Sequence, residues 1–260
     1  MGQDRRHKER VRSQFDRQAV SFSRWAVTGN RDYLGRYCDF LGLHRKDRLL
    51  DVACGTGEFS LFAAARVGSV TGVDISAGMI ARAREQAGGK DAGEVRFLCH
   101  DVEEIPLESG SFSIVVCKSA FHHMEDPSPV FREMVRCCEG GGRISVQDIL
   151  SYEDPEVNLF FEKIERQVDP SHYRTLAAGE VLDLYHRNGL EIIRTAEVEV
   201  ELDLEEYLAH ARQRSAARRE VRRLVAEGSR HGRLSPFIIV RGGELGFRRK
   251  VLLVLGRRKP

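Results

Sequence analysis

The stretch from residue 48 to residue 60, RLLDVACGTGEFS, constrains the fold of this chain more than any other feature. A short apolar run ends in Asp51, a turn follows that contains Gly55 and Gly57, and a helical pattern then begins. Glycine is favoured where the backbone takes a positive φ or approaches a ligand closely. The helix that follows offers free N–H groups and the positive end of its dipole to an anionic group. The pattern therefore predicts a strand, a tight turn and a helix start that bind a nucleotide-like ligand beyond the carboxyl end of the strand.

The residues around the glycines narrow the choice of nucleotide. A dinucleotide fingerprint needs a third glycine where this chain has Ser60, and the Gly-Lys-Ser/Thr triplet of a phosphate-binding loop does not occur in the sequence. The Asp51 carboxylate would repel a pyrophosphate, but it suits a ligand that carries an ammonium group. S-adenosylmethionine is such a ligand. The remaining interpretation is a purely structural glycine turn in an α/β unit.

Strand and helix patterns alternate between residues 48 and 148, as is typical of an α/β fold. Short apolar runs predict strands at 49–52, 70–74, 95–101, 113–118 and 143–148. Helical spacing of apolar residues predicts helices at 58–66, 78–86 and 129–138. Strands that alternate with helices imply a parallel sheet with right-handed crossovers.

The segments outside this core complete the predicted single domain of residues 1–260. Residues 1–45 form two aromatic-rich helices, broken near residues 28–30, that cover one end of the sheet, form a lid over a ligand, or both. Residues 46–149 form the cofactor-binding core. Residues 150–178 contain a strongly apolar helix at 157–167, which indicates a substrate cap. The C-terminal part, residues 179–260, is predicted to contain helices at 179–188 and 204–227 and strands at 190–202, 237–240 and 250–255.

Three aspartates mark the ends of three consecutive predicted strands. Asp74 ends the second strand about 20 residues after the first glycine, where a carboxylate accepts hydrogen bonds from ribose hydroxyls. Asp101 ends the third strand, where it can accept a hydrogen bond from an adenine amine. A single such aspartate is often a turn or helix-cap residue, but Asp51, Asp74 and Asp101 would lie along one edge of the sheet. Together they predict a site for an adenosyl group.

The motifs LDVACGTG at 50–57, GVDISAGM at 72–79 and HDVEEIPL at 100–107 resemble successive motifs of class I S-adenosylmethionine-dependent methyltransferases. The similarity is greatest to the small-molecule branch that includes ubiquinone and menaquinone C-methyltransferases. It implies a Rossmann-like, doubly wound, mainly parallel seven-stranded sheet with an antiparallel last strand. It also implies a cofactor site composed of Asp51, Ala53, Gly55, Thr56, Gly57, Asp74, Ile75, Met79, Asp101, Val102 and Lys118.

Within that set the resemblance implies separate roles. Asp51 and the glycine turn hold the methionine part of S-adenosylmethionine, with Lys118 beside it. Asp74 holds the ribose, Ile75 and Met79 flank the adenine, and Asp101 and Val102 bind its edge. The N-terminal region departs from the quinone enzymes, because Phe22 and Ser23 stand where those enzymes carry a Tyr-Asp pair.

Methyl transfer from a sulfonium is a direct displacement, so the alignment of the acceptor with the S–CH₃ bond carries much of the rate. A phenol or an acidic carbon as acceptor would also gain from a general base. His122, His123 and His172 are the candidates, because histidine titrates near neutrality. We select His123 and His172 as the pair expected to face the acceptor; a role in shaping the pocket is the alternative for each.

Composition limits the other functions. The formal net charge of +2, with 42% hydrophobic and 31% charged residues, is that of an ordinary soluble protein, and no apolar run is long enough to span a bilayer. The N-terminus carries no secretory signal, so the cytoplasm is the expected location. The six cysteines form no Cys-x-x-Cys pair, and no metal is expected. The sequence does not indicate an oligomeric state.

Three other functions stay open at this stage. The arginines of residues 205–233 could bind RNA or another polyanion, although interleaved glutamates favour a solvated helix face. An NAD-dependent oxidoreductase is disfavoured by Ser60 and Asp51. A protein that binds the cofactor without turnover is compatible with the motifs. A small-molecule methyl acceptor remains the expected partner, with nucleic acid disfavoured.

Overall fold

The computed structural model describes residues 3–25, 29–88, 95–210 and 213–260. Its centre is a sheet of eight strands with the order β3-β2-β1-β4-β5-β8-β6, and β7 pairs with β8 outside this path. The first five strands of the chain are parallel to one another. They are β1 (Arg48–Val52), β2 (Ser69–Asp74), β3 (Val95–Cys99), β4 (Phe112–Lys118) and β5 (Cys138–Ile149). The order reverses between β1 and β4, and such a switch point opens a crevice for ligands at the carboxyl ends of the strands.

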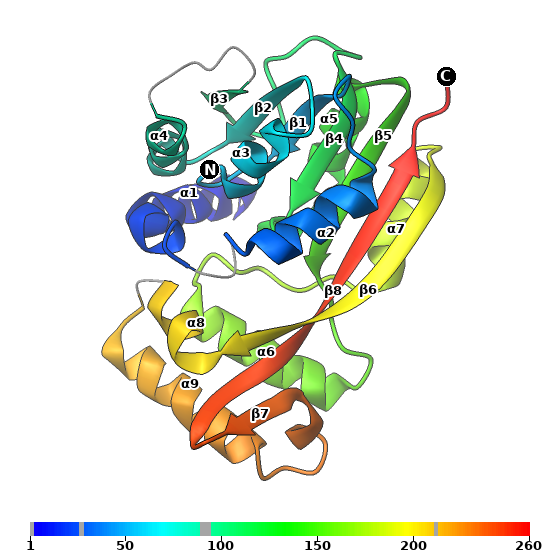
Figure 1. Cartoon of the computed structure of the whole chain (residues 1–260). Coiled ribbons are helices and arrows are strands. Elements are labelled where there is room, and N and C mark those ends of the chain that lie inside the picture. The colour runs from blue at the N-terminus through cyan, green and yellow to red at the C-terminus, as the bar shows by residue number, and fades with distance from the viewer. Residues whose placement is uncertain (1–2, 26–28, 89–94, 211–212) are drawn as a thin grey trace.

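Helices cover both faces of the sheet (Figure 1). On one face, α5 (Ser128–Cys137) and α7 (Ala178–Arg187) bury apolar side chains such as Phe131 and Tyr185 against β4 and β5. The helices of the other face pack into a second apolar cluster; they are α2 (Arg31–Leu41), α3 (Glu58–Ala64) and α4 (Ala77–Gln86). The predicted doubly wound α/β fold is confirmed.

The last strand in the chain, β8 (Glu244–Arg257), is antiparallel to both of its long neighbours, β5 and β6 (Glu191–Asp203). The predicted antiparallel last strand is therefore present. The short strand β7 (Ile238–Arg241) adds an eighth member to the seven strands that the resemblance implied, because it folds back on β8 as a hairpin.

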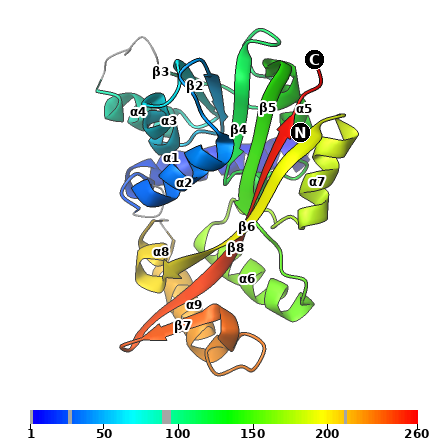
Figure 2. The same cartoon turned by 45° about the vertical axis from the view of Figure 1, so that its right-hand side comes forward.

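The far halves of β6 and β8 extend beyond the parallel strands and carry a smaller layer of helices (Figure 2). Three helices pack there around a third apolar cluster: α6 (Pro155–Val168), α8 (Leu204–His210) and α9 (Ser215–Gly228). The segment predicted as a cap, 150–178, is thus one part of a larger unit formed with the C-terminal region.

Two predicted elements differ from the structure. The single helix expected at 204–227 is two helices, α8 and α9, and residues 211 and 212 lie outside the described part. Gln213 Nε2 donates a hydrogen bond to the carbonyl oxygen of Leu208, 2.8 Å away, at the end of α8. The strand expected at 250–255 begins earlier, at Glu244, because its first half pairs with β7 on one side and with β6 on the other.

The N-terminal helix α1 (Gln3–Phe22) lies beside α4 and α8, at the carboxyl edge of the parallel strands (Figure 1). Asp16 fixes it there, because its Oδ1 accepts hydrogen bonds from the Ser76 hydroxyl at 2.6 Å and the Gly78 N–H at 2.9 Å. The predicted break between the first two helices falls partly on residues 26–28, outside the described part. No helix among the described residues is long and apolar enough to cross a membrane.

Candidate functional site

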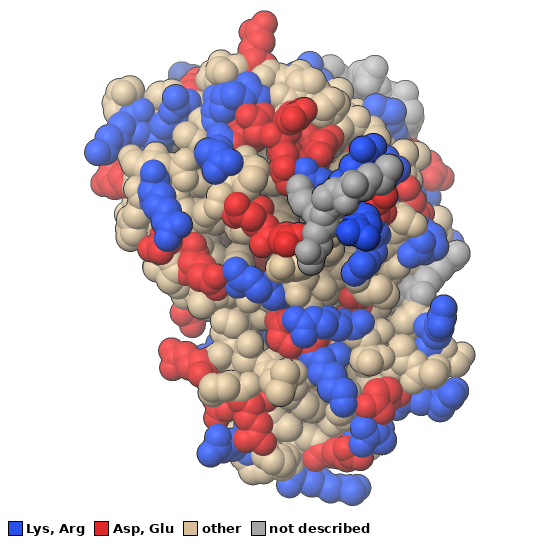
Figure 3. All heavy atoms as spheres, turned by 180° about the vertical axis from the view of Figure 1, so that it is seen from behind, with Lys and Arg blue, Asp and Glu red and all other residues tan. Residues whose placement is uncertain are grey.

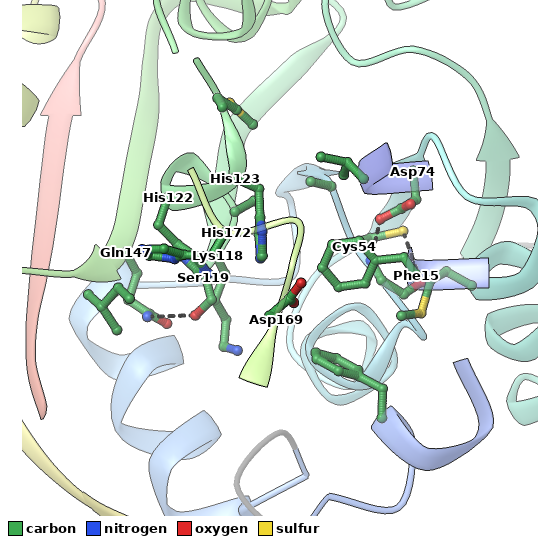
Figure 4. A pocket seen from close by; sticks show the side chains of 18 of the residues that line it. Phe15, Cys54, Asp74, Lys118, Ser119, His122, His123, Gln147, Asp169 and His172 are labelled. Carbon is green, nitrogen blue, oxygen red and sulfur yellow. Dashed lines mark hydrogen bonds between the residues drawn. The ribbon is translucent and has the colours of Figure 1, made fainter. Parts of the chain in front are cut away.

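A cavity of about 770 Å³ lies at the carboxyl ends of the parallel strands. The strand ends form one wall, and residues of α1, α6, α8 and β8 form much of the rest. Figure 4 shows Asp74 and Cys54 on one side of the cavity and three histidines, His122, His123 and His172, grouped on the other.

The glycine turn takes the backbone conformation that its sequence predicts. The φ angles of Gly55 and Gly57 are +55° and +82°, and Ala53 also has a positive φ, of 57°. A Cβ atom on Gly57 would lie 2.8 Å from the Phe97 ring, so this position excludes any side chain. Ala53 and Gly55 line the cavity.

Thr56 and Gly57, two of the predicted cofactor contacts, do not line the cavity. Thr56 is fully buried, and its hydroxyl donates a hydrogen bond to Glu58, 2.6 Å away. Gly57 instead begins α3 and packs against Phe97. The structure therefore gives both residues a role in holding the turn in shape.

Two buried carboxylates, Asp51 and Asp74, stand on either side of the turn. Burial raises the pKa of Asp51 to about 7, and the Ser60 hydroxyl, which donates a hydrogen bond of 2.5 Å, offsets only part of that shift. Burial likewise raises the pKa of Asp74 to about 6, although the N–H groups of Gly55 and Ser76 donate to it at 2.8 and 2.9 Å. Both groups would be fully ionised at neutral pH if a cation or further donors bound beside them.

The other predicted cofactor residues also line the cavity: Ile75, Met79, Asp101, Val102 and Lys118. Asp101 faces α1, because Lys8 Nζ lies 3.2 Å from its Oδ2 and 2.6 Å from Glu103. Burial lowers the pKa of Lys118, although the negative charges of Asp51 and Glu58 oppose this shift. The structure thus collects all but two of the predicted cofactor residues around one cavity.

An Asp–His pair at the ends of β4 and β5 was not predicted from the sequence. His122 Nδ1 lies 2.5 Å from Asp148 Oδ1, and Asp148 Oδ2 accepts the backbone N–H groups of Ala120 and Phe121 at 3.1 and 2.6 Å. Burial lowers the pKa of His122, but the charge of Asp148 and its hydrogen bond outweigh burial, so the pKa is raised. A sequence signal existed, because Asp148 ends a predicted strand as the three other aspartates do.

The two histidines selected from the sequence both line the cavity, but protein groups already hold them. His123 Nδ1 lies 3.2 Å from the Ser171 hydroxyl oxygen, and burial together with the neighbouring His122 lowers its pKa to about 3. His172 is buried, and its Nε2 lies 3.2 Å from Glu162. His122 and His172 thus each have a carboxylate beside one ring nitrogen, and the contact of His122 is the shorter of the two.

The wall that faces the strand ends comes from distant parts of the chain. Glu165 of α6 accepts a hydrogen bond from the Tyr207 hydroxyl at 2.5 Å, and Trp25 stacks on the His210 ring at 4.0 Å. Arg249 of β8 completes this wall. Sequence reasoning missed these residues because no motif connects them.

Comparison with known proteins agrees with this geometry. Residues 50–146 match a family model described as a methyltransferase domain. The chain is 29% identical to the uncharacterized methyltransferase YcgJ of Bacillus subtilis over 176 residues, which cover 68% of this chain and 70% of that protein. It is 31% identical to the ubiquinone/menaquinone biosynthesis C-methyltransferase UbiE of Methylobacterium nodulans over 140 residues, 52% of this chain and 55% of that one.

Solved structures show the same fold. The crystal structure of YcgJ superposes with a TM-score of 0.76 at 24% identity, covering 87% of this chain and 98% of that one. The Bacillus halodurans protein BH2331 gives a TM-score of 0.78 at 23% identity, with 87% and 99% covered. With the glycine turn and the strand-end carboxylates, these matches support a methyltransferase domain over residues 50–146 that resembles the class I S-adenosylmethionine-dependent enzymes.

Proposed function

We propose that this chain transfers the methyl group of S-adenosylmethionine to a small-molecule acceptor that binds in the same cavity. The observation that carries the proposal is that one cavity joins two sites. The buried carboxylates Asp51 and Asp74 flank the glycine turn on one side, and the His122–Asp148 pair lies on the other. The relative from Methylobacterium nodulans, whose name gives quinone C-methylation, supports a small-molecule acceptor.

The residues of the cofactor side fit S-adenosylmethionine by charge. Asp51 holds its ammonium group, since a carboxylate whose pKa is raised to about 7 by burial is stabilised in its ionised form by a cation. Asp74 accepts the ribose hydroxyls, Ile75 and Met79 flank the adenine, and Asp101 with Val102 binds its edge. The residues beside the methionine part are Ala53, Gly55 and Lys118.

The bound cofactor supplies a methyl group on a sulfonium, and the chain must align the acceptor with it at roughly 3 Å. His122 takes the proton of the acceptor on Nε2, since Asp148 holds Nδ1. Such a base contributes about 10²–10⁴-fold to the rate. We assign the base to His122 over His123, whose lowered pKa makes it a weak base, and over His172, whose contact with Glu162 is longer, at 3.2 Å.

A polyanion-directed function has less support in the structure. Arg222 is paired with Glu205 at 2.6 Å, and Arg223 with Glu220 and Glu227 at 2.8 and 2.7 Å. Basic and acidic side chains are interspersed on the face shown in Figure 3, without a continuous basic patch. These pairings favour the solvated helix face over an RNA site.

Calorimetric titration tests the cofactor assignment directly. We expect S-adenosylmethionine and S-adenosylhomocysteine to bind with one site per chain, and NAD not to bind. A cofactor-consumption screen over phenols, quinols and amines then identifies the acceptor class. Binding of NAD without binding of either adenosyl compound would refute the proposal.

A further inference from the structure

One buried cation of the cavity wall has no part in the function proposed above. Arg249 lies on β8, and only 2% of its surface is exposed. Side chains two positions apart on a strand point to the same face, so Arg249 lies between the buried residues Phe247 and Val251. Such a buried position usually carries an apolar residue, so the burial of a charged guanidinium group there requires a physical explanation.

The guanidinium group of Arg249 has fewer partners than it needs. Its Cζ lies 4.8 Å from the centre of the Phe161 ring and 5.4 Å from that of Tyr152, and its Nε lies 3.4 Å from Glu165 Oε1. None of its three nitrogens makes a hydrogen bond within the described part of the chain. An arginine carries five N–H donors, and buried donors without partners are rare in folded proteins.

The partner of these donors is best supplied from the cavity, because Arg249, Glu165 and Tyr207 all line it. Glu165 offers Arg249 only an ion pair, with its Oε1 3.4 Å from Nε, since its Oε2 accepts the Tyr207 hydroxyl. The two Nη atoms of a guanidinium form a planar fork that matches the two oxygens of a carboxylate. We propose that Arg249 binds a carboxylate group of the methyl acceptor, an inference that rests on the proposed methyl transfer to a small molecule.

The surroundings favour a monoanion over a phosphate. Glu165 lies 3.4 Å from Arg249 and Asp169 also lines the cavity, so a doubly charged phosphate would meet more repulsion from these carboxylates than a singly charged carboxylate would. The aromatic rings of Trp25 and Tyr207 line the cavity as well, and they offer an apolar surface to the body of the acceptor. The predicted acceptor is an aromatic or otherwise apolar molecule with one carboxylate.

Binding of simple probes tests this site without methyl transfer. Benzoate, benzamide and inorganic phosphate are titrated into the protein saturated with S-adenosylhomocysteine, by calorimetry and by the fluorescence of Trp25, the single tryptophan of the chain. We expect benzoate to bind at least about tenfold more tightly than benzamide, and phosphate to bind more weakly than benzoate. Titration of S-adenosylhomocysteine alone reports separately on the cofactor site.

If the proposal is correct, two substitutions change benzoate binding in opposite directions. Arg249→Met should abolish the preference for benzoate, whereas Glu165→Gln should strengthen benzoate binding severalfold, because it removes a negative charge beside the arginine. Arg249→Lys keeps the charge without the fork and should retain only part of the preference. Arg248→Met is the matched control, because Arg248 pairs with Glu201 of β6 and does not itself line the cavity, so its loss should leave all affinities unchanged.

Several outcomes would overturn the inference. They are failure of benzoate to bind, equal binding of benzoate and benzamide, tighter binding of phosphate, and weakened benzoate binding in Glu165→Gln. If Arg249→Met does not fold, the Arg249→Lys and Glu165→Gln variants decide. Intact binding of S-adenosylhomocysteine in these cases would leave the proposed function standing.

Discussion

The side of the cavity that we assign to the cofactor and the side that we assign to the acceptor are built in different ways. On the cofactor side, Asp74 and Lys118 end β2 and β4, and Asp51 is the last residue but one of β1, so the topology of the sheet brings them together. On the acceptor side, Glu165, Tyr207 and Arg249 come from two helices and a strand that meet only through tertiary packing. The strand-end positions suit a ligand shared by a fold class, whereas the packed wall can change with the acceptor.

The two sides also differ in how their buried carboxylates are satisfied. Asp51 has a hydroxyl partner, and burial raises its pKa to about 7. Asp148 is as deeply buried, which alone would raise its pKa, but His122 and several backbone N–H groups reverse the shift and lower it. Asp51 therefore has no ion pair within the described part of the chain, whereas Asp148 already has the imidazole ring of His122 as its partner. Substitutions on the acceptor side should therefore change the rate of methyl transfer, and substitutions on the cofactor side should change cofactor binding.

The largest expected effect is on the acceptor side. His122→Ala should lower the rate of methyl transfer by about 10²–10⁴-fold, because the acceptor then loses its general base. Binding of the cofactor should not change. Single-turnover methylation of an acceptor found in the consumption screen measures the rate, and calorimetry measures the binding.

The exposed histidine of α7 provides a matched control for this substitution, since His186→Ala removes the same group outside the cavity. The wild-type rate should rise with pH through a pKa above that of free histidine, since Asp148 raises the pKa of His122 and only the neutral ring accepts a proton. A full rate in His122→Ala combined with a loss in His172→Ala would place the base at His172 instead.

The next effect lies on the cofactor side. Asp74→Ala should weaken S-adenosylmethionine binding by about 1.5–3 kcal/mol, the value of hydrogen bonds to a charged group. The rate at saturating cofactor should be nearly unchanged, which is the reverse of the His122 result. Asp183→Ala, at an exposed carboxylate of α7, is the control. If Asp74→Ala binds S-adenosylmethionine with the affinity of the wild type, Asp74 does not hold the ribose.

The same contrast explains what the sequence could predict. The glycine turn and the strand-end aspartates occupy positions that short-range patterns determine, so Asp51, Asp74 and Asp101 could be placed on one edge before the structure was known. Gly57 was assigned a ligand contact because the sequence does not show that Phe97 fills the space where its side chain would be.

The acceptor side could be predicted only in part. His122 was recognised as a candidate, but its partner Asp148 lies 26 residues later, and only the register of β4 against β5 brings the two together. For Arg249 a weak signal existed. In a strand with neighbouring arginines at 248 and 249, one of the two must face inward, because successive side chains point to opposite faces. Which elements surround it depends on packing that no local pattern encodes.

A smaller effect concerns the pH dependence of the cofactor side. The ionised fraction of a group with a pKa of about 7 rises from about one tenth at pH 6 to about nine tenths at pH 8. If Asp51 must be ionised to hold the ammonium group, affinity for S-adenosylmethionine should increase about tenfold over this range. Calorimetry in buffers of different ionisation heat should also detect the release of a proton on binding at pH 6.

Stability should change with pH in the opposite direction to cofactor affinity. The pKa of Asp51 is higher in the folded chain than in the unfolded one, so the folded state binds an extra proton between about pH 4 and pH 7. The unfolding free energy of the free protein should therefore fall as the pH rises through this window. Asp51→Asn should reduce the pH dependence of both cofactor affinity and stability. If the variant shows the same pH dependence as the wild type, other groups cause it, and Asp74 is the first candidate.

The smallest expected effect is at the contact between α1 and the cofactor side. Lys8 bridges Asp101 and Glu103, and its side chain is 27% exposed, so the pair is worth about 0.2–1 kcal/mol and is screened by salt. When adenine binds at Asp101, Lys8 still reaches Glu103, which is the closer partner at 2.6 Å.

Lys8→Met should therefore speed cofactor dissociation by no more than about fivefold at low salt, and high salt should speed dissociation in the wild type alone. Arg5→Met, which removes an exposed pair with Glu9 within α1, should leave the dissociation rate unchanged. Slower dissociation in Lys8→Met would show that Lys8 competes with the cofactor for Asp101 and does not hold α1 over it.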